Sequence, residues 1–201
     1  MLNRNIPFYN IIMKKTCPEQ LNVPELPVEF ELHHYSPGVE RQWAELEYEI
    51  GDFPSVADAQ KYFVEKYLNH PELLERRGVF VSHRERKCLV GACIAWLDYQ
   101  GTKPVSSLHW LVTKEEYQNR GIASAMLAAA LNIYAEDNGF PVYLHTQPWS
   151  YKAIQLYCRY GFHLLKHETF AEFQNQYEQA LPILEQYIST DYLSDLIAHS
   201  E

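Results

Sequence analysis

The chain has 201 residues, of which 47% are hydrophobic and 21% are charged, and this composition indicates a globular protein of one domain with a short appendage. Its 17 Lys and Arg residues against 26 Asp and Glu residues give a net charge of −9. This acidity argues against duplex DNA as a partner, because affinity for DNA comes largely from cations that meet phosphates. No apolar run reaches the length of about 18 residues that a membrane span needs, so we expect neither a nucleic-acid nor a membrane partner.

Four cysteines, Cys17, Cys88, Cys93 and Cys158, are present, and none of them forms a CxxC pair. A core of this size does not need disulfides for its stability. We therefore interpret the four as reduced, buried thiols and expect a cytoplasmic protein.

The N-terminal segment predicts a strand and a linker. Residues 5–15 are largely apolar and are interrupted by Pro7 and Asn10, and no small-residue cleavage site follows, so a strand is a better interpretation than a signal peptide. Residues 16–27 contain three prolines and predict a linker. Residues 28–35 alternate well enough to predict a second strand.

Two helices are predicted next. Ser36 is the expected N-cap of the first helix, with Pro37 at its first helical position. Ser55 is the expected N-cap of the second, which should end at residues 69–71 because the residue before a proline disfavours the helical conformation.

The middle of the chain predicts three antiparallel strands and then a long helix. The strands cover residues 78–82, 88–99 and 105–113. The helix covers residues 121–138, with Gly139 as its expected stop. Its expected buried stripe consists of Ile122, Met126, Ala130, Ile133 and Tyr134.

A strand at 141–146, a helix at 150–160 and a strand at 162–167 complete the order of elements. Strands that alternate with helices in this way predict an α/β (α+β) fold with a mixed sheet. Beyond residue 167, apolar side chains recur near helical spacing and should pack on the protein's own core, with a homodimer contact as the alternative. These side chains are Phe170, Phe173, Tyr177, Leu181, Leu184 and Tyr187.

The segment that carries chemistry is the junction before the long helix, residues 118–123. The first backbone amides of a helix have no partner within the helix, and together with the helix dipole they favour an anion such as a pyrophosphate. Gly121 allows a close approach of the backbone because it has no Cβ atom. Ser124 can add a hydroxyl donor and Arg120 a positive charge.

Two motifs at this junction and further on resemble the GCN5-related N-acetyltransferase (GNAT) superfamily. The pattern Q/R-x-x-G-x-G/A is matched by Gln118, Gly121 and Ala123. The pattern N-x-x-A-x-x-L-Y-x-x-x-G-F is matched by Ala153, Leu156, Tyr157, Gly161 and Phe162, with Ser150 in place of the asparagine. The resemblance extends over residues 28–166, which it identifies as the N-acetyltransferase domain, between an N-terminal strand and linker at 1–27 and a helical extension at 167–201.

The resemblance implies a largely antiparallel central sheet with helices on both faces, in which the fourth and fifth strands splay apart around acetyl-CoA. Acetyl-CoA is then a cosubstrate, and no metal is expected. The implied cofactor residues are Leu111, Val112 and Thr113 for pantetheine; Gln118, Asn119, Arg120, Gly121, Ile122, Ala123 and Ser124 for pyrophosphate; and Ser150, Ala153 and Tyr157 beside pantetheine. Because Ser150 is shorter than asparagine, we expect weaker cofactor binding at this position.

The same resemblance implies a general acid and a general base. Tyr157 matches the family tyrosine near the sulfur of CoA, and its phenol is suited to protonate a leaving thiolate. His109 lies at the offset of a catalytic histidine in some family members and is the candidate base. Glu47, Glu49, Asp52 and Glu116 are rival carboxylates, and a histidine held within the sheet is the alternative interpretation of His109.

The acceptor site implied by the family lies on the first two helices and their loop. Its residues in this chain are Trp43, Glu47, Tyr48, Asp52 and Phe53, with Gln147 and Trp149 after the fifth strand. Aromatic and acidic side chains suit a cationic amine, which is either a small molecule or a peptide. The predicted function is direct N-acetyl transfer, and the alternative is a silent acyl-CoA sensor or interaction module of the same fold.

Other chemistries are disfavoured by spacing. The chain has no HExxH motif and no cysteine pair, and His163 and His167 lie on a predicted strand, where we do not expect them to form a metal site. Cys158 adjoins Tyr157, but neighbouring helical residues do not share a face, so thiol catalysis is not expected.

Overall fold

The structure is a computed structural model that describes residues 5–201, so residues 1–4 of the predicted N-terminal segment lie outside the described part. It divides into two compact units. The first comprises residues 19–96 and 108–137, and the second comprises residues 5–18, 97–107 and 138–201.

The first unit contains the helices and strands that lead to the long helix. They are β2 (Phe30–His34), α1 (Val39–Ile50), α2 (Val56–Phe63), a π-helical turn (Val64–Leu68), α3 (Pro71–Arg77), β3 (Gly78–His83), most of β4 (Cys88–Gln100), the last part of β5 (Lys103–Thr113), a 3-10 turn (Glu115–Tyr117) and α4 (Ile122–Glu136).

The second unit contains the N-terminal strand and the C-terminal elements. They are β1 (Ile11–Lys15), the remainder of β4 and β5, β6 (Val142–Thr146), a 3-10 turn (Pro148–Ser150), α5 (Tyr151–Arg159), β7 (His163–Leu164), α6 (Tyr177–Leu184) and α7 (Thr190–Ala198).

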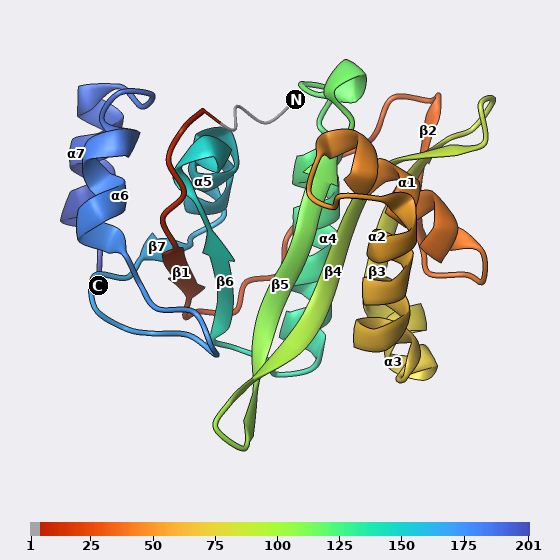
Figure 1. Cartoon of the computed structure of the whole chain (residues 1–201), viewed down its shortest axis with the longest axis horizontal. Coiled ribbons are helices and arrows are strands. Elements are labelled where there is room, and N and C mark those ends of the chain that lie inside the picture. The colour runs from red at the N-terminus through yellow and green to blue at the C-terminus, as the bar shows by residue number, and fades with distance from the viewer. Residues whose placement is uncertain (1–4) are drawn as a thin grey trace. The chain divides into compact units, whose positions relative to one another are not determined.

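The strands form one seven-stranded sheet in the order β2-β3-β4-β5-β6-β1-β7 (Figure 1). β1 is antiparallel to both β6 and β7, and β2, β3 and β4 pair in antiparallel fashion. β5 and β6 are parallel, with the pairs Ser106–Val142 and Ser107–Tyr143. The predicted α/β fold with a mixed, largely antiparallel sheet is therefore confirmed.

Within the first unit, the two faces of the sheet are covered by different helices. Phe80, Ala92 and Ile94 are fully buried in one cluster with side chains of α1 and α2. Gly91 faces α4, since a Cβ atom at this residue would lie 2.8 Å from the side chain of Met126. This alternation follows from the period of two in a strand. Figure 1 shows α1 and α2 in front of β3 and β4, with α4 behind them.

The helices of the first unit match the prediction except at their ends. Ser55 caps α2 as expected, with its hydroxyl accepting a hydrogen bond from the Asp58 amide. The predicted cap of α1 is wrong, because the N-cap is Gly38 in a left-handed conformation with φ of 101°. The end of α4 is also misplaced, since the left-handed residue there is Asn138 and not Gly139. Helix α3 was not predicted at all.

Several expectations for the rest of the chain need correction. The strand predicted at 162–167 is only His163–Leu164. Phe170, Tyr177 and Leu184 of the apolar stripe are buried, but Tyr187 is exposed. The four cysteines are unpaired, but Cys17 is exposed and only Cys93 is fully buried. No helix among residues 5–201 has the length and hydropathy to cross a membrane.

Candidate functional site

Adjacent side chains of β5, those of His109 and Trp110, lie on the same face of the sheet. The Nδ1 atom of His109 is 2.8 Å from the hydroxyl of Tyr67, and Trp110 packs in the cluster that contains Tyr67. A regular strand would place neighbouring residues on opposite faces. Trp110 breaks the alternation because its φ is 51°, a left-handed conformation that is rare for a bulky residue. Irregular strand positions of this kind are common beside functional sites.

Four aromatic rings, from α1, the loop after it, α2 and β5, meet at this point. The Trp43 ring of α1 lies 5.5 Å from that of Trp110 and 5.8 Å from that of Phe53. Tyr62 of α2 lies 5.4 Å from Phe53 and 5.5 Å from Trp110, measured between ring centroids. These four residues are called the aromatic cluster below. Trp43 and Phe53 were predicted as site residues, whereas Tyr62 and Trp110 were not.

Glu47 is a buried carboxyl group one helical turn after Trp43. The residue is 0% exposed, and within residues 5–201 neither of its carboxyl oxygens has a hydrogen-bond partner. The indole Nε1 of Trp43 is likewise buried and without a hydrogen-bond partner in the described part of the chain. Residues four apart in a helix are neighbours on one face, so Trp43 and Glu47 lie on the same buried face of α1. Buried polar groups are normally hydrogen-bonded, and such exceptions are common at functional sites.

The environment of Glu47 favours the neutral acid. Burial raises the pKa of Glu47 well above its ordinary value, and the negative charge of Asp52 raises this pKa further. A carboxyl with a raised pKa in an apolar setting keeps its proton to higher pH than an exposed carboxyl does, and a cation that binds beside it favours release of that proton.

The other acidic candidates are placed differently. Glu49 forms an ion pair of 2.7 Å with Lys114, and Glu116 lies 3.7 Å from Arg86, both in exposed positions. Tyr48 is 49% exposed, so it does not share the buried face of α1 with Trp43 and Glu47. Of the four rival carboxylates, Glu47 alone is fully buried.

The raised pKa of Glu47 predicts a pH-dependent cost to stability. Above pH 4.5 the unfolded chain ionises at Glu47 while the folded chain keeps the proton, so unfolding releases a proton. The free energy of unfolding then falls as pH rises, by up to about 1.4 kcal/mol per pH unit from this group. We expect Glu47→Gln to be more stable than the wild type, with a difference that grows from pH 5 to pH 8.

Denaturant titrations at several pH values measure this difference. Glu45→Gln is the matched control, because Glu45 lies on the same helix in an exposed ion pair with Arg41. The control should show no comparable trend with pH. A pH-independent difference for Glu47→Gln would contradict the assignment of a neutral Glu47.

The junction before α4 has the geometry that the pyrophosphate prediction requires. Asn119 and Gly121 are both left-handed, with φ of 63° and 79°, and Gly121 is the N-cap of α4. No side chain among the described residues caps this helix end. No described atom other than those of its chain neighbours lies within 4 Å of the position that a Cβ atom of Gly121 would occupy. The first amides of α4 thus face a site with room for an anion.

Side chains around this junction are held by local contacts. Gln118 donates a 3.3 Å hydrogen bond to the carbonyl oxygen of Thr113, and the buried hydroxyl of Thr113 has no hydrogen-bond partner in the described chain. Arg120 lies over the rings of Phe30 and Tyr117 and 3.4 Å from Glu29. Leu111 and Val112 are half-buried in β5, Ile122 is buried, and Ala123 and Ser124 are half-buried.

The remaining predicted site residues belong to the second unit. Tyr157 of α5 is 7% exposed, and its ring lies 5.8 Å from that of Phe162. Ser150 accepts a 2.8 Å hydrogen bond from the side-chain amide of Gln147. Trp149 packs on Phe8 at 5.2 Å between ring centroids. Ala153 is half-buried on α5.

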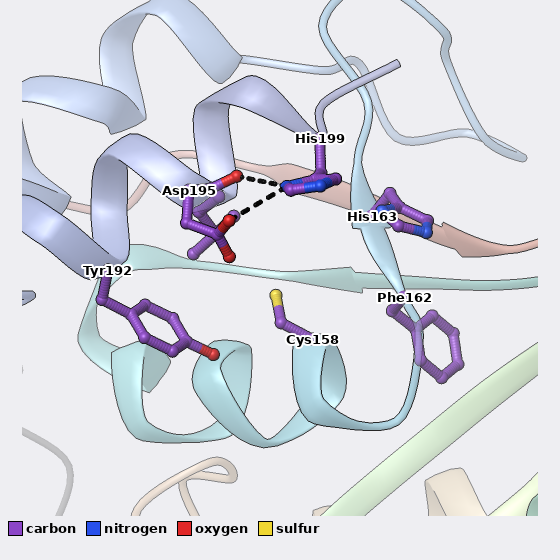
Figure 2. A pocket seen from close by; sticks show the side chains of 7 residues that line it. Cys158, Phe162, His163, Tyr192, Asp195 and His199 are labelled. Atoms are coloured by element: carbon purple, nitrogen blue, oxygen red, sulfur yellow. Dashed lines mark hydrogen bonds and ion pairs between the residues drawn. The ribbon is translucent and has the colours of Figure 1, made fainter.

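A cavity of about 220 Å³ also lies in the second unit, between α5 and α7 (Figure 2). The Cys158 thiol points into it, opposite the hydrogen-bonded pair of Asp195 and His199. Burial, with the charge of Asp195, raises the pKa of Cys158 to about 12. A thiol with this pKa is not a thiolate at neutral pH and is a poor nucleophile. Among residues 5–201, no three His, Cys, Asp or Glu side chains gather in a way that could hold a metal ion.

Comparisons with known proteins show the family of this chain. The model of the acetyltransferase (GNAT) family matches residues 41–162. The chain therefore belongs to the acetyltransferase (GNAT) family. No curated protein matches the chain.

Solved structures share the fold at low sequence identity. A GCN5-related N-acetyltransferase from Sphaerobacter thermophilus has a TM-score of 0.60 and 23% identity, over 79% of this chain and 49% of that one. An Arabidopsis thaliana protein in complex with the bisubstrate analogue CoA-Ac-MVNAL has a TM-score of 0.51 and 21% identity, over 67% and 83%. Diaminobutyrate acetyltransferase from Paenibacillus lautus has a TM-score of 0.51 and 15% identity, over 67% and 75%. The chain spans about half of the length of the Sphaerobacter structure.

Proposed function

We propose that this protein transfers an acetyl group from acetyl-CoA directly to a primary amine. The observation that carries the proposal is the junction at residues 118–124. Asn119 and Gly121 are left-handed there, α4 begins without a side-chain cap among the described residues, and the position of a Cβ atom on Gly121 has open space around it. The amides of Ile122, Ala123 and Ser124 are suited to bind the pyrophosphate. The unsatisfied hydroxyl of Thr113 is an additional donor beside this junction.

His109 is the proposed general base in this reaction. An amine acceptor must lose a proton before it attacks a thioester, and a histidine is suited to accept this proton near neutral pH. The Nδ1 atom of His109 is hydrogen-bonded to the hydroxyl of Tyr67. In a neutral imidazole only one nitrogen carries a proton, so Nε2 can accept a proton when Nδ1–H is the donor to the Tyr67 oxygen. This contact orients the His109 ring, and the tautomer with its proton on Nδ1 leaves Nε2 as the accepting atom.

Tyr157 is the proposed general acid, and its hydroxyl would protonate the thiolate of CoA as it leaves. We expect Tyr157→Phe to lower kcat about 100-fold, since general acid catalysis contributes typically 10²–10⁴-fold. The affinity for acetyl-CoA should stay within a few-fold of the wild type. Steady-state kinetics and calorimetry measure the two quantities.

Tyr160→Phe is the matched control for this prediction, because Tyr160 lies at the end of the same helix. Its kcat should remain close to that of the wild type. Full activity of Tyr157→Phe would exclude the role of Tyr157 as the acid.

The remaining features of the proposal concern the whole chain. Residues 28–166 are proposed as the catalytic domain, in a cytoplasmic protein, and a homodimer through residues 167–201 stays a prediction. The neighbouring structures carry a peptide-like bisubstrate analogue in one case and L-2,4-diaminobutyric acid with coenzyme A in another. Both classes of acceptor, a peptide and a small amine, are therefore included in the first screen.

Two measurements test the proposal. Calorimetry with acetyl-CoA should show binding, and a lack of binding at millimolar ligand would overturn the proposed function. A screen of amines for release of free CoA thiol should then find at least one acceptor. Tight binding of acetyl-CoA without turnover on any acceptor would instead favour the sensor of the same fold.

A further inference from the structure

We propose that Glu47 and the aromatic cluster of Trp43, Phe53, Tyr62 and Trp110 bind an ammonium group of the acceptor that does not react, so that the preferred acceptors are diamines. This inference rests on the proposed acetyl transfer and specifies the chemistry of its acceptor.

The first argument is the unsatisfied carboxyl group. Both oxygens of Glu47 are buried without a hydrogen-bond partner in the described chain, as is the Nε1 atom of Trp43. Leaving buried polar groups unpaired costs free energy that an apolar residue at the same position would not cost. An ammonium group can donate to both carboxyl oxygens and thereby remove this cost.

The second argument explains why the ligand of Glu47 is a cation and not a neutral hydrogen-bond donor. The ring centroids of the aromatic cluster lie 5.4–6.3 Å from one another, and aromatic faces attract ammonium ions. Among the described residues, the charge that raises the pKa of Glu47 in addition to burial is the negative charge of Asp52, which also favours a cationic ligand. A site with one buried carboxyl and several aromatic faces is selective for cations.

The third argument concerns which nitrogen occupies the site. The reacting amine must be neutral when it attacks, and in the proposed reaction it loses its proton to His109 and not to Glu47. The nitrogen held by Glu47 is therefore a second one on the same molecule. Glu47 transfers its proton to the solvent as the ammonium group enters, and the carboxylate and ammonium then form a charge-assisted hydrogen bond.

Entry to Glu47 requires a side chain to move, because Glu47 is fully covered. We infer that this side chain is Phe53, because it is the ring of the aromatic cluster that lies in a loop, the short one that joins α1 to α2. The loop starts at Gly51, whose φ of 91° is a left-handed conformation that glycine adopts without strain. Rotation of Phe53 opens the aromatic cluster without unfolding either helix.

Calorimetry on the full chain saturated with acetyl-CoA tests the proposal. The probes are linear α,ω-diamines with three to six carbons, each compared with the n-alkylamine of the same length. We expect binding of the preferred diamine to the wild type to release more protons than binding of the monoamine, measured at pH 7 in buffers of different ionisation enthalpy. We also expect an affinity at least about 30-fold higher for the diamine than for the monoamine.

Glu47→Gln should lose the proton release and reduce the diamine preference to within about 3-fold, while Glu45→Gln keeps both. Equal affinity for diamine and monoamine, or a diamine bound without proton release, would overturn the inference even if acetyl-CoA binds normally. A failure of the proposed function is distinguishable, because it appears as a lack of acetyl-CoA binding. The proton release is measured on the wild type, so the test does not depend on the folding of a variant.

Discussion

Gly121→Glu is expected to reduce the affinity for acetyl-CoA by about 1000-fold. The carboxylate would stand at the N-cap of α4, where no described atom fills the space beside the backbone and where we place the pyrophosphate. Two like charges about 4 Å apart repel by about 4 kcal/mol at an effective dielectric constant of 20, which corresponds to roughly three decades of affinity. The same carboxylate also occupies the volume that the phosphates need.

Two variants separate charge and bulk from backbone strain. Gly101→Glu introduces the same residue at another left-handed glycine, with φ of 64° and open space around it, in the turn between β4 and β5. It should cost similar stability and leave acetyl-CoA binding unchanged. Gly121→Gln keeps the bulk without the charge and should bind acetyl-CoA more tightly than Gly121→Glu. Unaltered binding in Gly121→Glu would place the pyrophosphate elsewhere.

The long helix and its start were predictable from local sequence. The stripe of α4 is fully apolar at helical spacing, and Gly121 is its N-cap as the motif suggests. The short α3 was missed because Pro71 was interpreted only as the end of the preceding helix, although a proline also begins a helix well. The local sequence does not show whether a proline ends one helix or begins the next, because this depends on the tertiary packing of the residues that follow it.

The decisive features of the site are not local. Among the four acidic candidates, Glu47 alone is fully buried, and burial depends on tertiary packing that the local sequence does not reveal. The left-handed conformation of Trp110 brings His109 and Trp110 to one face, and a bulky residue gives no sequence signal for such a conformation. The alternating pattern of a strand therefore predicts the position of His109 in β5 but not the direction of its side chain.

Asp137→Ala is expected to lower the free energy of unfolding by about 3–5 kcal/mol. Asp137 follows α4 and forms an ion pair with Arg77, whose side chain is only 7% exposed. Arg77 also donates to the Ala95 carbonyl oxygen and lies over the ring of Tyr134, so it cannot turn to water. Removing Asp137 leaves a buried charge without its partner, which costs far more than the loss of an exposed pair. Thermal unfolding should then show a decrease in Tm of roughly 6–20 °C.

Two further variants identify the buried charge as the cause. Arg76→Ala removes a second partner of Asp137 that is 52% exposed, so it should cost no more than about 1 kcal/mol. The double variant Arg77→Met with Asp137→Ala should be more stable than Asp137→Ala alone, because it removes the unpaired charge together with its partner. If the two substitutions were instead additive, the cost would come from lost contacts of each side chain and not from an uncompensated charge. The sign of this coupling therefore distinguishes an electrostatic constraint at the end of α4 from ordinary packing.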